Sequence, residues 1–288
     1  MNFSANNWIA GIKHDAFSLS VSPNNGQFGF FGPFSLLNVD YGELQGTMVW
    51  DNDQGFIDTE KFYPSALAIG FGYGRALSES FSFGGAGLKK AYQYLGHNVV
   101  PVTDSSKVVE KIFPMPLLLF LGTIYMTDWH GFTFGMSVRN FSDETQYAYD
   151  GFQLPLTFRI GGSIDLFSFV PAVSEKQSFL FAIDALHPRS YPERVNLGLE
   201  YSFMSIGYMR FGYLYNYDER DLTYGAGFKL GPLSIDYALT PFGVFDSVNR
   251  ISIGKIQMRF LSLFWVFSAY ISSPYSLGRS KLSRKYLG

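Results

Sequence analysis

Apolar and polar residues alternate regularly in the C-terminal third of the chain. Four segments carry a large apolar or aromatic residue at nearly every second position: 194–203, 210–217, 222–230 and 233–240. A period of two residues is typical of β-strands and not of helices. The connections are short (Met204-Ser205 and Gly231-Pro232) or polar (Asp218 to Asp221). We therefore expect four consecutive antiparallel strands.

The two faces of these predicted strands differ in an unusual way. One face is crowded with Phe, Tyr and Leu, while the other carries mainly Gly, Ser and Ala with single charged residues. A sheet in a soluble protein usually exposes many Lys, Glu and Thr on its outer face. A sheet closed on itself in a bilayer instead turns its aromatic face to lipid and its small or polar face to a lumen. The pattern therefore predicts an all-β, antiparallel transmembrane barrel.

The preceding part of the chain shows the same alternation with interruptions. Residues 40–64 are expected to form a long surface loop or an irregular hairpin, and residues 140–151 a polar loop. In the interrupted region 98–112, Ser105 to Lys111 predicts a short helix at the barrel mouth or an external loop. Further extended segments are expected at 8–21, 27–39, 64–95, 112–127, 131–139, 154–166 and 179–183.

Two of these segments allow another interpretation. Gly70, Gly72 and Gly74 could belong to a phosphate-binding loop, but no Lys-Ser/Thr follows, and glycines at every second residue share one face of a strand. Residues 112–127 are uncharged and could be interpreted as a membrane helix. They contain Pro114 and Pro116, however, and are shorter than a membrane-spanning helix. We expect a strand in both places.

Both ends of the chain leave questions open. Residues 1–7 have neither the basic start nor the apolar core of a signal peptide, so we expect an exported protein from which the natural N-terminus has been removed. The alternation changes phase near Gly254, where a bulge would restore it before a last strand ending at Phe260. We therefore divide the chain into a barrel, 1–260, and a tail, 261–288, which is an added strand, a loosely ordered segment or a membrane helix.

Composition agrees with a membrane barrel. The 288 residues are 47% hydrophobic and 18% aromatic, only 16% are charged, and none is Cys. This length fits a barrel of about 12–14 strands at about 20 residues per strand and connection. A net charge of -2 gives no reason to expect a nucleic-acid partner.

No catalytic or metal-binding motif is present. The four histidines are far apart in sequence and lack metal-ligand spacing, and no Ser-centred elbow occurs. Asp184 and His187 could form a dyad with a serine, but we interpret them as a strand-end carboxylate and a loop histidine. We expect no enzyme activity, no metal and no cofactor.

Charged residues on the small-residue face are the candidate functional residues. Charges facing lipid are costly, so they are expected to point into the lumen, where they form a structural ion-pair network or select the head group of an amphipathic ligand. The candidates are Arg159, Arg194, Glu200, Arg210, Lys229 and Asp236.

Several segments resemble a known family. The sequences LPLTFRIG (154–161), RVNLGLEY (194–201), RFGY (210–213), LTYGAGFKLGPLSIDYALTPFG (222–243) and NRISI (249–253) are similar to the PorV/PorQ proteins, which resemble the FadL-type transporters of long-chain fatty acids. The N-terminal segments 5–21, 67–89 and 135–142 fit the same pattern. The resemblance covers most of residues 5–260.

The resemblance implies a FadL-like barrel of about fourteen strands in a bacterial outer membrane. Members of the family are expected either to carry hydrophobic small molecules or to receive secreted cargo proteins at the cell surface in type IX secretion. Compared with the pattern of this family, we expect the sequence to lack the N-terminal plug segment and the tail after Phe260 to be an addition. The expected partners are outer-membrane lipid, a hydrophobic ligand and secreted protein cargo.

Overall fold

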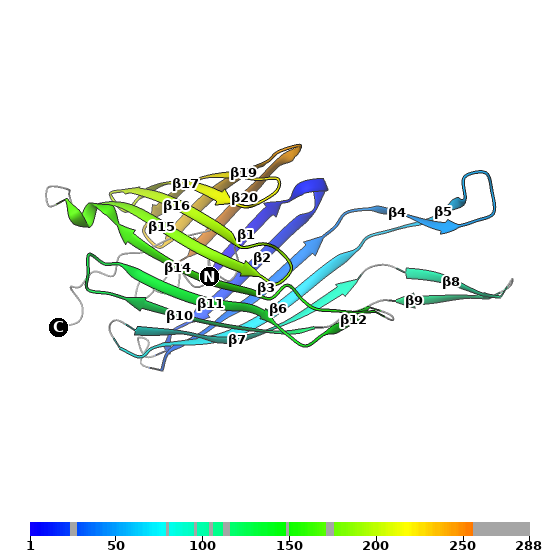
Figure 1. Ribbon diagram of the computed structural model, residues 1–288, viewed down its shortest axis with the longest axis horizontal. Coiled ribbons are helices and arrows are strands. Elements are labelled where there is room, and N and C mark those ends of the chain that lie inside the picture. Colours follow the sequence, from blue (N-terminus) through cyan, green and yellow to red (C-terminus); the bar gives the residue numbers. More distant parts are fainter. Residues whose placement is uncertain are drawn as a thin grey trace.

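The wall of the protein is a single closed antiparallel sheet (Figure 1). A computed structural model describes residues 1–23, 28–78, 81–94, 97–103, 106–111, 116–147, 150–170 and 176–255. Each wall strand pairs with the next wall strand along the chain, and β1 also pairs with β20, which closes the sheet. The predicted all-β barrel is confirmed, and its wall contains 14 strands among the described residues.

The wall strands have the following bounds: β1 (Asn2–Asn7), β2 (Lys13–Val21), β3 (Phe30–Asp40), β6 (Ser65–Ala76), β7 (Phe81–Tyr94), β10 (Leu117–Met126), β11 (Thr133–Phe141), β14 (Thr157–Asp165), β15 (Gln177–Pro188), β16 (Arg194–Phe203), β17 (Gly207–Tyr215), β18 (Leu222–Leu230), β19 (Leu233–Phe242) and β20 (Phe245–Lys255). A short 3-10 helix, η1 (Ile9–Gly11), connects β1 to β2, and another, η3 (Leu166–Phe169), follows β14.

Three two-stranded hairpins extend the wall at one end of the barrel, where they project to the right in Figure 1. They are β4 (Leu44–Val49) with β5 (Phe56–Phe62), β8 (His97–Thr103) with β9 (Ser106–Lys111), and β12 (Thr145–Tyr147) with β13 (Asp150–Phe152). We call this end the hairpin end. The opposite end, which we call the turn end, holds Met1, Lys255 and tight turns such as Met204-Ser205.

The outer face of the wall is apolar and aromatic. Along β17, Phe211 and Tyr213 are 42% and 40% exposed, whereas Leu214, on the other face, is 3% exposed. The same alternation of exposed rings with enclosed small or polar residues continues through β18 and β19. Figure 1 shows one wall around the interior and no second layer over the outer face. The rings therefore face outward, as expected for a barrel in lipid.

The tight turns at the turn end explain the register of β16 to β19. Met204 and Ser205 have φ of 53° and 55°, and Gly231 has φ of 56°. Positive φ at both central residues of the first turn, Met204 and Ser205, and at the first central residue of the second, Gly231, gives each turn a twist that matches the right-handed twist of the flanking strands. The pairs Phe203↔Gly207 and Leu230↔Leu233 then fix which residues face inward on all four strands.

Several sequence-based expectations need correction. Trp8 was expected to enter a strand, but it lies in the connection between β1 and β2, and the polar segment Asn2–Asn7 is the first wall strand. Tyr217 lies in the loop after β17. Ser105 to Lys111 was expected to be a short helix or an external loop, whereas Ser106–Lys111 is the strand β9 of a projecting hairpin. A helix is disfavoured there by the adjacent β-branched pair Val108 and Val109, which suits a strand.

The irregular hairpin expected at 40–64 is present as β4 and β5, and the polar loop at 140–151 contains the short strands β12 and β13. Gly254, near which the sequence analysis expected a bulge, pairs with Ser234 of β19 and with Asn2 of β1 without a register shift. The strand end expected at Phe260 and the tail 261–288 lie outside the described residues. No described helix has the length and apolar character needed to span a membrane.

Candidate functional site in the barrel lumen

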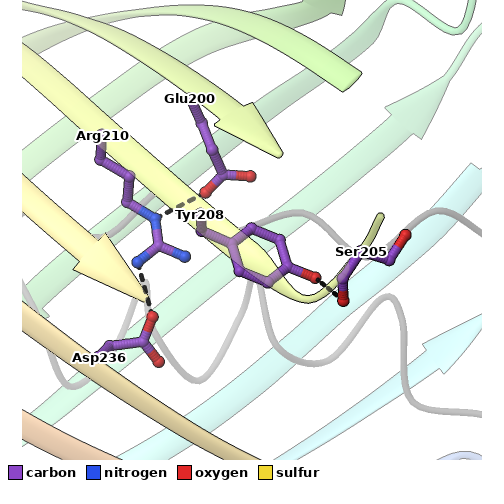
Figure 2. A network of polar contacts seen from close by, with 5 residues as sticks. All are labelled: Glu200, Ser205, Tyr208, Arg210 and Asp236. Carbon is purple, nitrogen blue, oxygen red and sulfur yellow. Dashed lines mark hydrogen bonds and ion pairs between the residues drawn. The ribbon is translucent and has the colours of Figure 1, made fainter. Parts of the chain in front are cut away.

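Three of the predicted residues form an ion triad on the inner face of the wall. Arg210 on β17 donates from Nε to Oε2 of Glu200 on β16 and from Nη1 to Oδ1 of Asp236 on β19, each over 2.6 Å (Figure 2). The side chains of Glu200 and Asp236 are only 8% and 18% exposed. Because a buried charge is costly unless it is paired, the guanidinium between two carboxylates stabilises both of them.

Two glycines on β18 allow this triad to form. Arg210 pairs with Gly225, and Asp236 pairs with Gly227, so β18 lies between the arginine and the aspartate. A Cβ atom at Gly227 would collide with Oδ1 of Asp236, and it would approach Nη1 of Arg210 to 3.1 Å. The glycines of β18 therefore leave the space through which Arg210 reaches a carboxylate two strands away.

Tyr208 completes the network at the turn end. Its ring lies 5.5 Å from the guanidinium carbon of Arg210, and its hydroxyl donates to the carbonyl oxygen of Ser205 over 3.0 Å (Figure 2). One carboxylate oxygen of Asp236, Oδ2, is buried and has no hydrogen-bond partner. The triad carries two carboxylates and one guanidinium, so its net charge is negative.

Arg159 lies in a second ion pair on another part of the wall. Its Nη1 is 3.9 Å from Oδ2 of Asp184, and both side chains are buried. Asp184 on β15 fits there because Gly161 on the neighbouring strand β14 has no side chain. The interpretation of Asp184 as a strand-end residue was wrong, because Asp184 lies in the middle of β15 and faces the lumen.

His187 lies on the opposite face from Asp184, so the two do not form a dyad. Nδ1 of His187 is 3.1 Å from Oε1 of Glu193, and both side chains are exposed at the hairpin end. The backbone N–H of Glu193, together with the His187 ring, holds the pKa of this carboxyl below its usual range. Within the part of the chain that the structure describes, no three His, Asp or Glu residues gather as a metal site would require.

Arg194 belongs to a stack of rings and guanidinium groups at the hairpin end and not to the ion triad. Its guanidinium carbon lies 4.5 Å from the ring of Tyr191 and 4.4 Å from that of Tyr217. The guanidinium carbon of Arg220 lies 4.8 Å from the ring of Tyr217 and 5.1 Å from the ring of Phe242. Such cation–π contacts link the loop before β16 to the loop after β17 and to the end of β19.

Lys229 faces inward on β18 opposite Ser234, and its side chain makes no salt bridge within the described residues. The structure also reveals inward-facing charges that the sequence analysis did not single out: Lys89, Arg139, Asp165 and Arg250. The signal was available for Lys89, because it continues the inner-face series of Gly85 and Gly87 along β7.

Together, the closed antiparallel wall, the aromatic outer face and the paired inner charges define a transmembrane β-barrel. No protein-family model matches the chain, and a search of curated proteins gives no match. Its resemblance to the PorV/PorQ proteins therefore remains a sequence-based interpretation.

Three solved structures of similar shape are the CymD monoaromatic hydrocarbon channel, the P. putida toluene transporter TodX and the KdgM porin. The TM-score with CymD is 0.47 at 11% identity, over 89% of this chain and 88% of that chain. For TodX the score is 0.45 at 9% identity, over 89% of both chains. For the KdgM porin it is 0.35 at 8% identity, over 89% of this chain and 99% of that chain.

Proposed function

We propose that this protein is a bacterial outer-membrane barrel that binds or transports hydrophobic small molecules. The observation that carries the proposal is the apolar character of part of the inner face. Leu118 on β10, Leu180 and Leu186 on β15, and Leu214 on β17 all point away from the lipid and are 8% exposed or less. A water-filled pore has a polar interior, whereas a site for hydrophobic ligands is lined mainly by apolar side chains.

The arrangement of the two ends supports an orientation in the membrane. Outer-membrane barrels have short turns on the periplasmic side and longer loops on the extracellular side. The three projecting hairpins share one end, while tight turns and the described N-terminus share the other. We therefore place the hairpin end at the cell surface and the turn end in the periplasm.

A substitution on the inner face tests the proposed ligand class. Changing Leu214 to Gln is expected to weaken the binding of an alkylbenzene about tenfold, because the amide adds a polar group to an apolar contact surface. The measurement is equilibrium dialysis of radiolabelled propylbenzene against the protein in lipid nanodiscs, with empty nanodiscs subtracted.

The neighbouring residue provides a matched control. Tyr213 lies on the same strand but faces outward, so Tyr213→Phe is expected to leave propylbenzene binding unchanged. Equal propylbenzene uptake by empty nanodiscs and by nanodiscs that contain the protein would contradict the proposed function.

A second candidate function is that of a type IX secretion component that receives exported cargo proteins. The observation in its favour is the exposed apolar surface of the β4–β5 hairpin, where Val49, Trp50 and Phe56 are 88%, 54% and 43% exposed. Exposed aromatic side chains on a projecting segment are typical of protein-binding surfaces.

Removal of the hairpin tip distinguishes the two candidates. A deletion of residues 48–57 is expected to leave propylbenzene binding intact, because the tip lies beyond the barrel wall. If the protein receives cargo, the deletion abolishes the co-purification of exported proteins with the tagged barrel from its own bacterium. Unchanged co-purification would exclude the hairpin tip as the cargo-binding surface.

A further inference from the structure

The β4–β5 hairpin projects from the barrel as a sheet of only two strands (Figure 1). It extends the wall strands β3 and β6 beyond the hairpin end, and among the described residues β4 and β5 pair only with each other. Each of these two strands therefore has one edge whose backbone N–H and C=O groups are available to a further strand. A two-stranded hairpin is marginally stable in water, and a third strand would stabilise it.

The edge of β4 lacks the features that usually protect an exposed edge. Natural edge strands commonly carry charged residues, Pro or a bulge. The six residues of β4 include no charged residue and no Pro. The neighbouring strand β5 carries Asp58, Glu60 and Lys61, and the register shift of the pair places the additional residue in β5. The edge of β4 is thus the one that is open to an added strand.

The hairpin is also strongly acidic. Residues 43–63 contain five carboxylates and a single cation, Lys61, which forms a salt bridge with Glu43. A concentration of one sign of charge attracts a partner of the opposite sign and repels a second copy of the same hairpin. The other four carboxylates are exposed and make no salt bridge within the described residues: Asp51, Asp53, Asp58 and Glu60. Charge therefore favours a basic partner.

A long basic side chain on an added strand can reach these carboxylates. Thr47 pairs with Asp58, so a residue added beside Thr47 would lie two strands away from Asp58 and on the same face. The barrel wall contains a contact of this kind, because Arg210 on β17 reaches Asp236 on β19 across β18. The next residue of β4 on this face is Val49, which is exposed and offers an apolar contact.

We propose that the edge of β4 binds an extended, basic segment of another protein by β-strand addition. Backbone hydrogen bonds join the segment to β4, and alternate Lys or Arg side chains pair with Asp58 and the carboxylates near it. The inference goes beyond the proposed function, because it concerns the hairpin and not the lumen. It identifies the partner by its charge and its extended backbone, and it stands whether or not the barrel carries hydrophobic molecules.

Peptides that differ in one property at a time test the site. The probe is an end-capped peptide in which Lys alternates with Val. One comparison peptide has Glu in place of Lys, and the other carries a methyl group on every backbone nitrogen. Binding to the full chain in nanodiscs of zwitterionic lipid is measured by fluorescence anisotropy of an uncharged dye on the peptide. The Lys peptide is expected to bind about tenfold more tightly than either comparison peptide, because it alone combines positive charge with free backbone N–H groups.

Neutral variants test the role of the carboxylates. Asp58→Asn/Glu60→Gln is expected to weaken binding of the Lys peptide about tenfold. The matched control is Asp218→Asn/Glu219→Gln, which removes two exposed carboxylates from the loop between β17 and β18, far from the hairpin in the order of the wall strands. This control is expected to leave peptide binding unchanged. Heat-modifiable migration in gels checks that both variants are folded.

Several results would overturn the inference: no binding of the Lys peptide, equal affinity for the Lys and Glu peptides, or equal effects of the two double variants. Equal affinity for the methylated peptide would also overturn it, because charge alone would then explain the binding. Dimers of the chain that depend on β4 and form without peptide would assign the edge to a second copy instead. Propylbenzene binding in the same nanodiscs reports separately on the proposed function.

Discussion

Replacing Arg210 with Met is expected to lower the free energy of unfolding by about 3–5 kcal/mol, the largest effect of any single substitution considered for this barrel. Without the guanidinium, Glu200 and Asp236 would remain enclosed in the wall without their shared cation. The measurement is reversible unfolding in urea from lipid vesicles, followed by tryptophan fluorescence.

A triple variant separates the loss of pairing from the loss of packing. In Glu200→Gln/Arg210→Met/Asp236→Asn, no charge is left without a partner, so most of the lost stability is expected to return. If Arg210→Met alone lowers the free energy of unfolding by less than about 1 kcal/mol, the three charges are solvated and do not form a buried network.

Phe211→Arg is expected to lower the free energy of unfolding by about 2–4 kcal/mol. Phe211 lies at the centre of β17 and is exposed on the outer face, so the substitution places a cation among acyl chains near the middle of the membrane. Unfolding from lipid vesicles measures the effect.

The control at this position is Phe211→Leu, which keeps an apolar side chain toward the lipid. It is expected to cost less than about 1 kcal/mol. An arginine tolerated as well as leucine would show that water, and not lipid, surrounds Phe211.

The sequence predicted those features of the fold that depend on local patterns. The alternation of rings with small residues identified β16 to β19, because the side chains of a strand point to opposite faces in turn. The first strand escaped detection, because Asn2–Asn7 contains one large apolar residue, Phe3, and its pairing with β20 joins the two ends of the chain. Such a contact between distant segments leaves no periodic signal in a single sequence.

The sequence likewise predicted which residues of the candidate site share a face of the sheet, but not the contacts that they make. Alternation placed Glu200, Arg210 and Asp236 on one face, but the reach of Arg210 across β18 depends on the order of the strands and on Gly227. Alternation could not foresee that Arg194 would stack between two loop tyrosines, because loop conformations do not follow the strand period. Asp184 was misjudged because the bounds of β15 were set too short.

Single-cysteine labelling tests the central claim most directly, because the chain has no native Cys. Cysteines introduced one at a time along β17, at positions 209–215, would carry an environment-sensitive fluorophore in vesicles of brominated lipid. We predict strong quenching at 209, 211, 213 and 215 and weak quenching at 210, 212 and 214, in agreement with the alternating exposure of this strand. Uniform quenching, or quenching of the opposite set of positions, would contradict a barrel whose aromatic face meets the membrane.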